Sequence, residues 1–251
     1  MYAGPQAFQS PDLLSGGTIA AVQPSTFVLV PGAGSNADYW SLVTPRLQQA
    51  GHQAIAVDLP NWPGATLAHQ ADAIVTAVAD LEHVVLVAQS MGAFSAPLAC
   101  DRVPVDWLVL LNAMIPQPGE TAGEWWDNTG QAAAVRENEI REGRDPDAVF
   151  DLATAFFHDL PPEVLEQLLR SESAEPAESL FGVPFDLPAW PDVPTTVLAG
   201  RDDRLFPLEF QQRVARERLG LAAEPVPGGH LAALSQPEAL ADRLLRGPGG
   251  G

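Results

Sequence analysis

The sequence predicts an α/β fold with a mostly parallel central sheet flanked by helices. Short apolar runs alternate with amphipathic segments along most of the chain. Uninterrupted apolar runs of this length are typical of strands buried on both faces, as in a parallel sheet. Most runs end in Gly, Pro or a polar residue, where a strand would turn into the next helix. The 251 residues, 46% of them hydrophobic, are enough for one large domain with an insertion.

The first half of the chain contains four such runs and the helices between them. We expect strands at 27–30, 53–57, 84–88 and 107–111. We expect helices at 36–50, where Pro45 marks a kink, and at 66–80, where Thr66 is the N-cap. A further helix follows Ser90, and Pro97 lies too deep in it for a first-turn proline, so we expect a bend or an early break there.

The alternation of strands and helices stops between residues 112 and 194, which we expect to form a helical lid inserted over one end of the sheet. Thr121 and Glu124 match a capping box. We predict helices over 122–142, 146–157 and 162–170, and irregular structure over 171–191.

The alternation returns in the last quarter of the chain. We predict a strand at 195–199, a helix at 208–219, a weak strand at 223–226 and a final helix that ends at Arg246. A second capping-box match, starting at Ser235, would open that final helix.

These elements divide the chain into four parts. Residues 26–111 and 195–246 would form the core, with the lid at 112–194 between them. Residues 1–25 would be a partly ordered leader; it contains no basic residue and no compact apolar block, so it does not resemble a secretory signal. Residues 247–251 would be a frayed tail.

Composition excludes several classes of function. The net charge of −19 argues against binding to nucleic acids or to anionic membranes. All 13 basic residues are Arg, and the absence of Lys excludes Schiff-base enzymes, pyridoxal-phosphate enzymes, Walker-type phosphate loops and Ser–Lys dyads. The sequence contains no run of 18 apolar residues, the length from which a membrane-spanning helix would be expected. The single Cys favours a cytoplasmic protein without an internal disulfide.

Four loops with special residues follow predicted strands, at 31–34, 89–92, 200–207 and 228–230. Right-handed crossovers bring the carboxyl ends of parallel strands to one edge of a sheet, so we expect these loops to meet. Ser90 lies where a buried strand turns into a helix, a place where backbone N–H groups favour negative charge. A nucleophilic serine requires this environment. The glycine loop at 31–34 lacks the G-x-G-x-x-G pattern that would indicate a nucleotide site.

From residue 27 to residue 246 the sequence resembles the α/β-hydrolase family, whose members carry Ser, then Asp or Glu, then His in that chain order. Ser90, Asp203 and His230 follow it, each after a strand. The glycine loop and the Ala-Gln-Ser-Met-Gly turn are similar to those of compact lid-bearing bacterial carboxylesterases related to plant methylesterases and hydroxynitrile lyases. Two departures are Ala88 in place of the first Gly of the motif, and Pro31-Gly32 in place of His-Gly.

The resemblance implies a role for each of these residues. Ser90 would be the nucleophile, His230 the general base and Asp203 the carboxylate that orients the imidazole. Asp203 is preferred to Asp202 because the family's acid lies three residues after the Gly that ends this strand and four before a Pro. Backbone N–H groups of Ala33 and Met91 would form the oxyanion hole.

Six residues are candidates for the substrate pocket, on weaker grounds: Gly32, Gln89, Trp126, Phe157, His158 and Leu231. Lid aromatics could equally pack the lid itself, and His158 could be an ordinary histidine at a helix C-terminus. His52, His69 and His83 are expected to be solvated rather than catalytic. Neither a cofactor nor a metal is expected, since the lone Cys and the scattered His residues form no ligand cluster.

These features favour a serine hydrolase that cleaves a small to medium apolar carboxylic ester through an acyl-enzyme. A serine at the turn excludes the epoxide hydrolases and haloalkane dehalogenases of this fold, which use a carboxylate. Leu231 stands where plant-type hydroxynitrile lyases have Lys. Two alternatives remain open: a thioester or C–C bond hydrolase of secondary or aromatic metabolism, and a non-catalytic ligand-binding protein. The sequence does not decide between a monomer and a homodimer.

Overall fold

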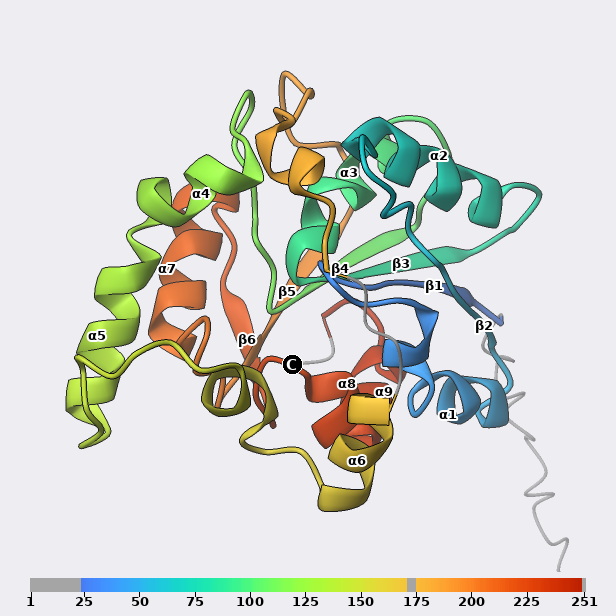
Figure 1. The fold of residues 1–251 in the computed structure, drawn as a ribbon. Coiled ribbons are helices and arrows are strands. Elements are labelled where there is room, and N and C mark those ends of the chain that lie inside the picture. The colour runs from blue at the N-terminus through green and yellow to red at the C-terminus, as the bar shows by residue number, and fades with distance from the viewer. Residues whose placement is uncertain (1–23, 171–174, 250–251) are drawn as a thin grey trace, which may run out of the picture.

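The protein is built around one six-stranded parallel sheet with helices on both faces (Figure 1). The computed structural model describes residues 24–170 and 175–249. The strand order is β2-β1-β3-β4-β5-β6, which confirms the predicted fold class. The strands are β1 (Thr26–Val30), β2 (Gln53–Ala56), β3 (Val84–Gln89), β4 (Trp107–Leu111), β5 (Thr195–Gly200) and β6 (Ala223–Val226).

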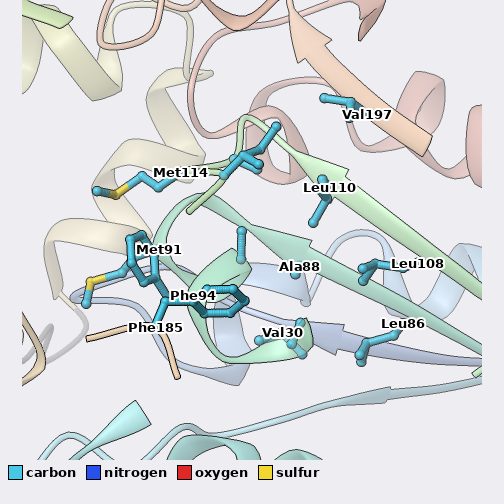
Figure 2. Close-up of a cluster of buried hydrophobic side chains, with 14 of the residues drawn as sticks. Val30, Leu86, Ala88, Met91, Phe94, Leu108, Leu110, Met114, Phe185 and Val197 are labelled. Atoms are coloured by element: carbon cyan, nitrogen blue, oxygen red, sulfur yellow. The ribbon is translucent and has the colours of Figure 1, made fainter. Parts of the chain in front are cut away.

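Alternate residues of each central strand enter two separate hydrophobic layers. In β3, Leu86 and Ala88 point into one layer, drawn in Figure 2, and Val85 and Val87 into the other. The first layer is covered by α2 (Leu67–Val78), α3 (Ala96–Cys100) and α7 (Leu208–Leu219). The second is covered by α1 (Thr44–Gln49), α8 (Ala232–Ser235) and α9 (Pro237–Leu245). Burial on both faces explains why these strands read as unbroken apolar runs.

The register of the sheet brings three loops to one edge. Val30 of β1 pairs with Ala88 of β3, and Gln89 pairs with Leu111 of β4. Because all three strands are parallel, the residues that follow them emerge side by side. The chain runs from β1 outward to β2 on one side and then to β3 on the other, and such a reversal of strand order creates a crevice at the carboxyl ends of the strands.

Two prolines begin helices rather than bending them. The predicted helix over 36–50 is wrong: a 3-10 turn, η1 (Ala37–Trp40), is followed by α1, and Pro45 lies in the first turn of α1. The break expected near Pro97 is confirmed, because the 3-10 turn η2 (Ser90–Phe94) ends before α3 begins. The expectation that Pro97 lies too deep for a first-turn proline is wrong, because α3 starts at Ala96 and Pro97 lies in its first turn. A first-turn proline gives up no helical hydrogen bond, because its N–H would have no partner within the helix.

Between β4 and β5 the chain forms short helical pieces. The predicted helix over 122–142 is wrong in being continuous: Gly130, with φ +64°, separates α4 (Ala122–Thr129) from α5 (Gln131–Arg141). Left-handed backbone of this kind ends helices and favours glycine. The capping box that opens α4 is confirmed, since Thr121 Oγ1 accepts from the N–H of Glu124 and the Glu124 carboxylate accepts from the N–H of Thr121.

The rest of this connection differs from the sequence-based expectation in one helix. The predicted helix over 146–157 is wrong, because regular structure there is limited to a π-helical turn, η3 (Ala153–Phe157). The predicted helix over 162–170 is confirmed as α6 (Pro162–Arg170). A short 3-10 turn, η4 (Glu178–Gly182), lies within the stretch expected to be irregular, part of which, residues 171–174, is outside the described residues.

The start of the final helix is also corrected. The second capping box does not form: Ser235 is the last residue of α8, and α9 begins at Pro237 without a side-chain cap and ends at Leu245. The proposed leader, 1–25, lies outside the described residues except for positions 24 and 25. In the described part of the chain, none of the helices has the length and apolar character needed to cross a bilayer.

Candidate active site

Ser90 occupies a strained turn at the end of β3. Its φ is +50°, in the left-handed region that non-glycine residues rarely adopt. The turn is held in place because the N–H of Met114 donates to the Ser90 carbonyl at 3.0 Å. The residue is 8% exposed, so its hydroxyl lies in a largely enclosed space. Strain of this kind persists only where the surroundings impose it, and it is concentrated at functional sites.

Two glycines allow the loop after β1 to approach this turn. A Cβ on Gly32 would lie 2.3 Å from Gln89 Oε1 and 2.8 Å from Ser90 Cβ. A Cβ on Gly92 would lie 2.7 Å from the Pro31 carbonyl oxygen. All three distances are too short for a side chain, so the glycine loop and the serine turn fit together only with glycine at these two positions.

Ser90, His230 and Asp203 form a hydrogen-bonded chain. His230 Nδ1 lies 2.8 Å from Asp203 Oδ2, and His230 Nε2 lies 3.1 Å from Ser90 Oγ. A carboxylate can only accept, so Nδ1 carries the proton and Nε2 of the neutral ring is free to accept from the serine hydroxyl. His230 is 1% exposed and Asp203 is 2% exposed. The structure thus brings together three side chains that are 27 to 140 residues apart in the chain.

The Asp203 carboxylate is held by several further donors. Its Oδ1 accepts from the N–H groups of Leu205 at 2.9 Å and Phe206 at 2.8 Å, and its Oδ2 is 3.3 Å from Gln211 Nε2. Asp202, by contrast, is exposed, and its carboxylate accepts from the N–H of Gly228 at 3.4 Å. Of these two neighbouring acids, only Asp203 contacts the imidazole.

Asn112 and Gln89 hold the backbone that carries His230. The buried Asn112 amide donates to the carbonyls of Gly229 at 3.0 Å and His230 at 3.1 Å, and its Oδ1 accepts from the N–H of Gly200 at 2.6 Å. Gln89 Nε2 also lies 3.3 Å from the His230 carbonyl. Sequence reasoning missed Asn112. The sequence pattern that identified Ser90, a polar residue directly after a buried strand, could also have identified Asn112.

Aromatic rings enclose the His230 imidazole. Phe206 lies 4.9 Å and Phe156 lies 5.1 Å from it, centroid to centroid, and both rings are nearly perpendicular to it. Tyr39 is also buried, and its pKa is raised well above the ordinary range by burial, with smaller contributions from Asp203 and Asp159. The two phenylalanine rings help to keep bulk water away from the imidazole.

A small void lies between the glycine loop and the serine turn. It measures about 10 Å³, and Ala33 and Met91 are among the residues that line it. This is close to the space that one water molecule requires. In the described part of the chain, the N–H groups of Ala33 and Met91 have no hydrogen-bond acceptor. Two unsatisfied donors beside a water-sized void could receive an oxyanion.

A larger cavity of about 350 Å³ adjoins this void, and both are bounded by Gly34, Ser35, Leu59 and Asn61. Its other walls come from η1, from α6, from Leu231, which directly follows His230 in the chain, and from Leu234. Apolar and polar side chains contribute to the lining, and its charged members are Asp38 and Asp58. A volume of this size is at the lower end of the range for small-molecule sites.

Only two of the six predicted pocket residues line the larger cavity or the small void. Leu231 lines the larger cavity and Gly32 lines the small void. Gln89, Trp126, Phe157 and His158 line neither of the two. Trp126 packs on Phe206, which itself contacts His230.

The remaining histidines lie outside this constellation and make local contacts. His52 accepts from the Ser25 N–H, His69 closes the cap at Thr66, and His83 pairs with Asp106. Among the described residues, no three His, Cys, Asp or Glu side chains converge as a metal site would require.

Known proteins resemble this chain over most of its length. The model of the alpha/beta hydrolase family matches residues 27–243. Norfluorocurarine synthase 1 of a Strychnos species is 24% identical, with 87% of this chain and 93% of that protein covered. Probable esterase PIR7A of Oryza sativa subsp. indica is 28% identical, with 88% and 95% covered. The crystal structure of a polyneuridine aldehyde esterase superimposes with a TM-score of 0.71 at 22% identity, covering 89% of this chain and 98% of that one.

Proposed function

Because the chain belongs to the alpha/beta hydrolase family, we propose that it is a serine hydrolase that cleaves carboxylic esters of small to medium size. The observation that carries the proposal is the hydrogen-bonded chain from Ser90 through His230 to Asp203, at 3.1 Å and 2.8 Å. The relative named as an esterase, matched over 88% of this chain, supports ester cleavage in particular. The single cysteine is consistent with a reducing, cytoplasmic setting.

In the first half of the proposed reaction, Ser90 Oγ attacks the ester carbonyl carbon while His230 Nε2 takes the hydroxyl proton. Asp203 accepts from Nδ1 and stabilises the imidazolium that forms. The tetrahedral oxyanion enters the small void, where the N–H groups of Ala33 and Met91 donate to it. The imidazolium then gives its proton to the departing alcohol oxygen, which leaves an ester between the acyl group and Ser90.

In the second half, the same groups act on water. His230 Nε2 removes a proton from a water molecule as that water attacks the acyl carbon, and the oxyanion forms again in the same void. When the tetrahedral species collapses, Ser90 Oγ leaves and recovers its proton from His230. The net change is one ester and one water consumed, and one alcohol and one carboxylic acid released.

The size of the cavity limits the substrate. About 350 Å³ between η1, α6 and Leu231 has room for the larger part of a modest ester. The leucines of its wall favour an apolar group. We assign the connection between β4 and β5 the part of a lid, because it contributes α6 to the cavity and Phe156 to the surroundings of His230.

The proposal is tested with p-nitrophenyl acetate and butyrate, together with thioester and lactone panels of similar size. We expect the wild-type protein to release p-nitrophenol and to be labelled by a fluorophosphonate probe. Ser90→Ala should abolish both, because it removes the nucleophile but retains the backbone N–H groups. A chromatogram of released acid and alcohol confirms that the ester bond is the one broken.

Several results would contradict the proposal. Hydrolysis that persists in Ser90→Ala would mean that another group attacks the ester. A protein that turns over thioesters or C–C bonds but not esters would favour the alternative hydrolase class. The absence of both turnover and probe labelling in a folded protein would favour a ligand-binding role for the same cavity.

A further inference from the structure

The connection between β4 and β5 contacts the loop of His230 directly, 70 residues away in the chain. Its π-helical turn, η3, places Phe156 against the imidazole at 5.1 Å. Two residues beyond the turn, Asp159 Oδ2 accepts from the N–H of Gly229 at 2.6 Å. The residue that precedes the proposed base is therefore held by a carboxylate from outside the sheet.

Gly229 is held at both of its backbone polar groups. Asp159 accepts from its N–H, and Asn112 Nδ2 donates to its carbonyl oxygen at 3.0 Å. Because donor and acceptor are both engaged, the peptide planes that flank Gly229 cannot rotate without breaking a hydrogen bond. The position of the His230 backbone depends on those planes.

The close approach of this segment depends on the absence of a side chain at Gly229. A Cβ there would lie 2.9 Å from His158 Cε1 and 3.0 Å from Asp159 Oδ1. Asp159 Oδ1 and both ring nitrogens of His158 are buried without a hydrogen-bond partner in the described part of the chain. Burial of unpartnered polar atoms is unfavourable, so the packing of this segment on the loop is maintained at a cost to stability.

We propose that Asp159 is a positioning residue for the general base: its hydrogen bond to Gly229 holds the His230 loop where Nε2 reaches Ser90. This inference rests on the proposed function for its kinetic consequence but not for its structural one. Hydrogen bonds from a backbone N–H to a carboxylate are short and strong. A displacement of about 1 Å in a catalytic group can lower a rate about a hundredfold.

The kinetic test compares Asp159→Ala, Asp159→Asn and the matched control Asp186→Ala. Asp186 is an exposed aspartate of the same connection and lies outside the π-helical turn. With p-nitrophenyl acetate in rapid mixing, we expect Asp159→Ala to lower the acylation and deacylation rate constants by one common factor of about 10 to 100. The same base serves both steps, so a positioning defect slows both.

The conservative variant should rescue the rate. The Asn side chain keeps an oxygen that accepts from Gly229, so Asp159→Asn should stay within about threefold of the wild-type constants, as should Asp186→Ala. An Asp159→Ala protein with wild-type constants would overturn the proposal. So would a change confined to KM or to acylation alone, because such a change indicates substrate binding rather than the base.

A spectroscopic readout separates this inference from the proposed function. The proton shared by His230 Nδ1 and Asp203 should give a downfield ¹H resonance in the wild type, in Asp159→Asn and in Asp186→Ala, and should broaden or vanish in Asp159→Ala. An unchanged resonance in Asp159→Ala overturns the inference even if no ester is hydrolysed. If Asp159→Ala does not fold, Gly229→Ala separates the same two segments from the other side and should show the same losses.

Discussion

The adjacent residues Asp202 and Asp203 lie in very different environments. The Asp203 side chain is buried and has one donor from His230 and two from backbone N–H groups. Asp202 is exposed and has one long contact with the N–H of Gly228. An acid that must stabilise an imidazolium needs direct contact and a fixed orientation, and only Asp203 has both.

This contrast gives a prediction at the residue scale. Asp203→Asn should lower kcat for a p-nitrophenyl ester by about 10³- to 10⁴-fold, because an amide can donate to the imidazole and favour the wrong tautomer. Asp202→Asn should change kcat by less than about threefold, because its carboxylate does not contact His230. Steady-state kinetics of the two variants, with circular dichroism to verify folding, checks this. The assignment of the acid would be wrong if Asp202→Asn caused the large loss of kcat and Asp203→Asn did not.

The residues of the site differ in how visible they are in the sequence. Ser90, Asp203 and His230 each follow a strand, and the parallel sheet brings strand ends together, so local pattern and topology are sufficient to group them. Asp159 and Phe156 belong to no such pattern. Asp159 reaches Gly229 and Phe156 reaches His230 because a long connection folds back over the sheet edge, and the packing that directs it is not local in sequence.

At the scale of single elements, most errors concern where helices break. Apolar spacing shows which face of a segment is buried, but it does not show whether the backbone stays helical. A capping box shows where a helix starts but not where it ends, and Gly130 interrupts the helix predicted over 122–142 because its left-handed φ of +64° ends the hydrogen-bond ladder. The turn at Ala153–Phe157 widens to π-helical where Phe156 packs on His230, and π-helical turns are frequent at functional sites.

A buried ion pair joins two of these elements. Glu120, just before α4, and Arg218, in the last turn of α7, have side chains only 4% and 5% exposed. Glu120 also accepts from Asn128 and from the Gln117 N–H, and Arg218 also donates to the Ile115 carbonyl. The pair therefore fastens the connection between β4 and β5 to the helix that carries Gln211, which contacts Asp203.

This pair gives a prediction at the element scale. Arg218→Met should lower the free energy of unfolding by about 3–5 kcal/mol, because it leaves the Glu120 carboxylate buried without its cation. Arg216→Met, which changes an exposed arginine of the same helix, should cost less than about 0.5 kcal/mol. Urea denaturation followed by tryptophan fluorescence measures both. If the two variants lost the same free energy of unfolding, the buried ion pair would stabilise the fold no more than an exposed arginine does.

At the scale of the whole molecule, the negative charge of the chain and of the larger cavity disfavours anionic substrates. The net charge is −19, and the larger cavity is lined by Asp38 and Asp58 and by no arginine or histidine of the described residues. A substrate that carries a carboxylate would meet negative charge both on approach and inside the cavity, whereas a neutral ester would meet neither penalty.

This distribution leads to the last prediction. Esters of matched shape, such as 3,3-dimethylbutyl acetate and its isostere acetylcholine, should be compared with an anionic ester of similar size. A unit charge about 8 Å from one carboxylate in water changes the free energy by about 0.5 kcal/mol, so two carboxylates should lower kcat/KM for the anion about fivefold relative to the neutral ester.

The effect should be electrostatic in origin, and two controls test that. Raising the ionic strength to 0.5 M should bring the kcat/KM values of the anionic and neutral esters within about twofold of each other, because exposed charges are screened within a few ångströms at that salt concentration. The double variant Asp38→Asn, Asp58→Asn should do the same at low salt. The amide oxygen introduced at position 58 would still accept from the Ala37 N–H, which now donates to Asp58 Oδ1 at 2.8 Å, so the loop should keep its shape. If the anionic ester is still rejected in that variant, shape rather than charge excludes it, and the lining leucines become the residues that select the substrate.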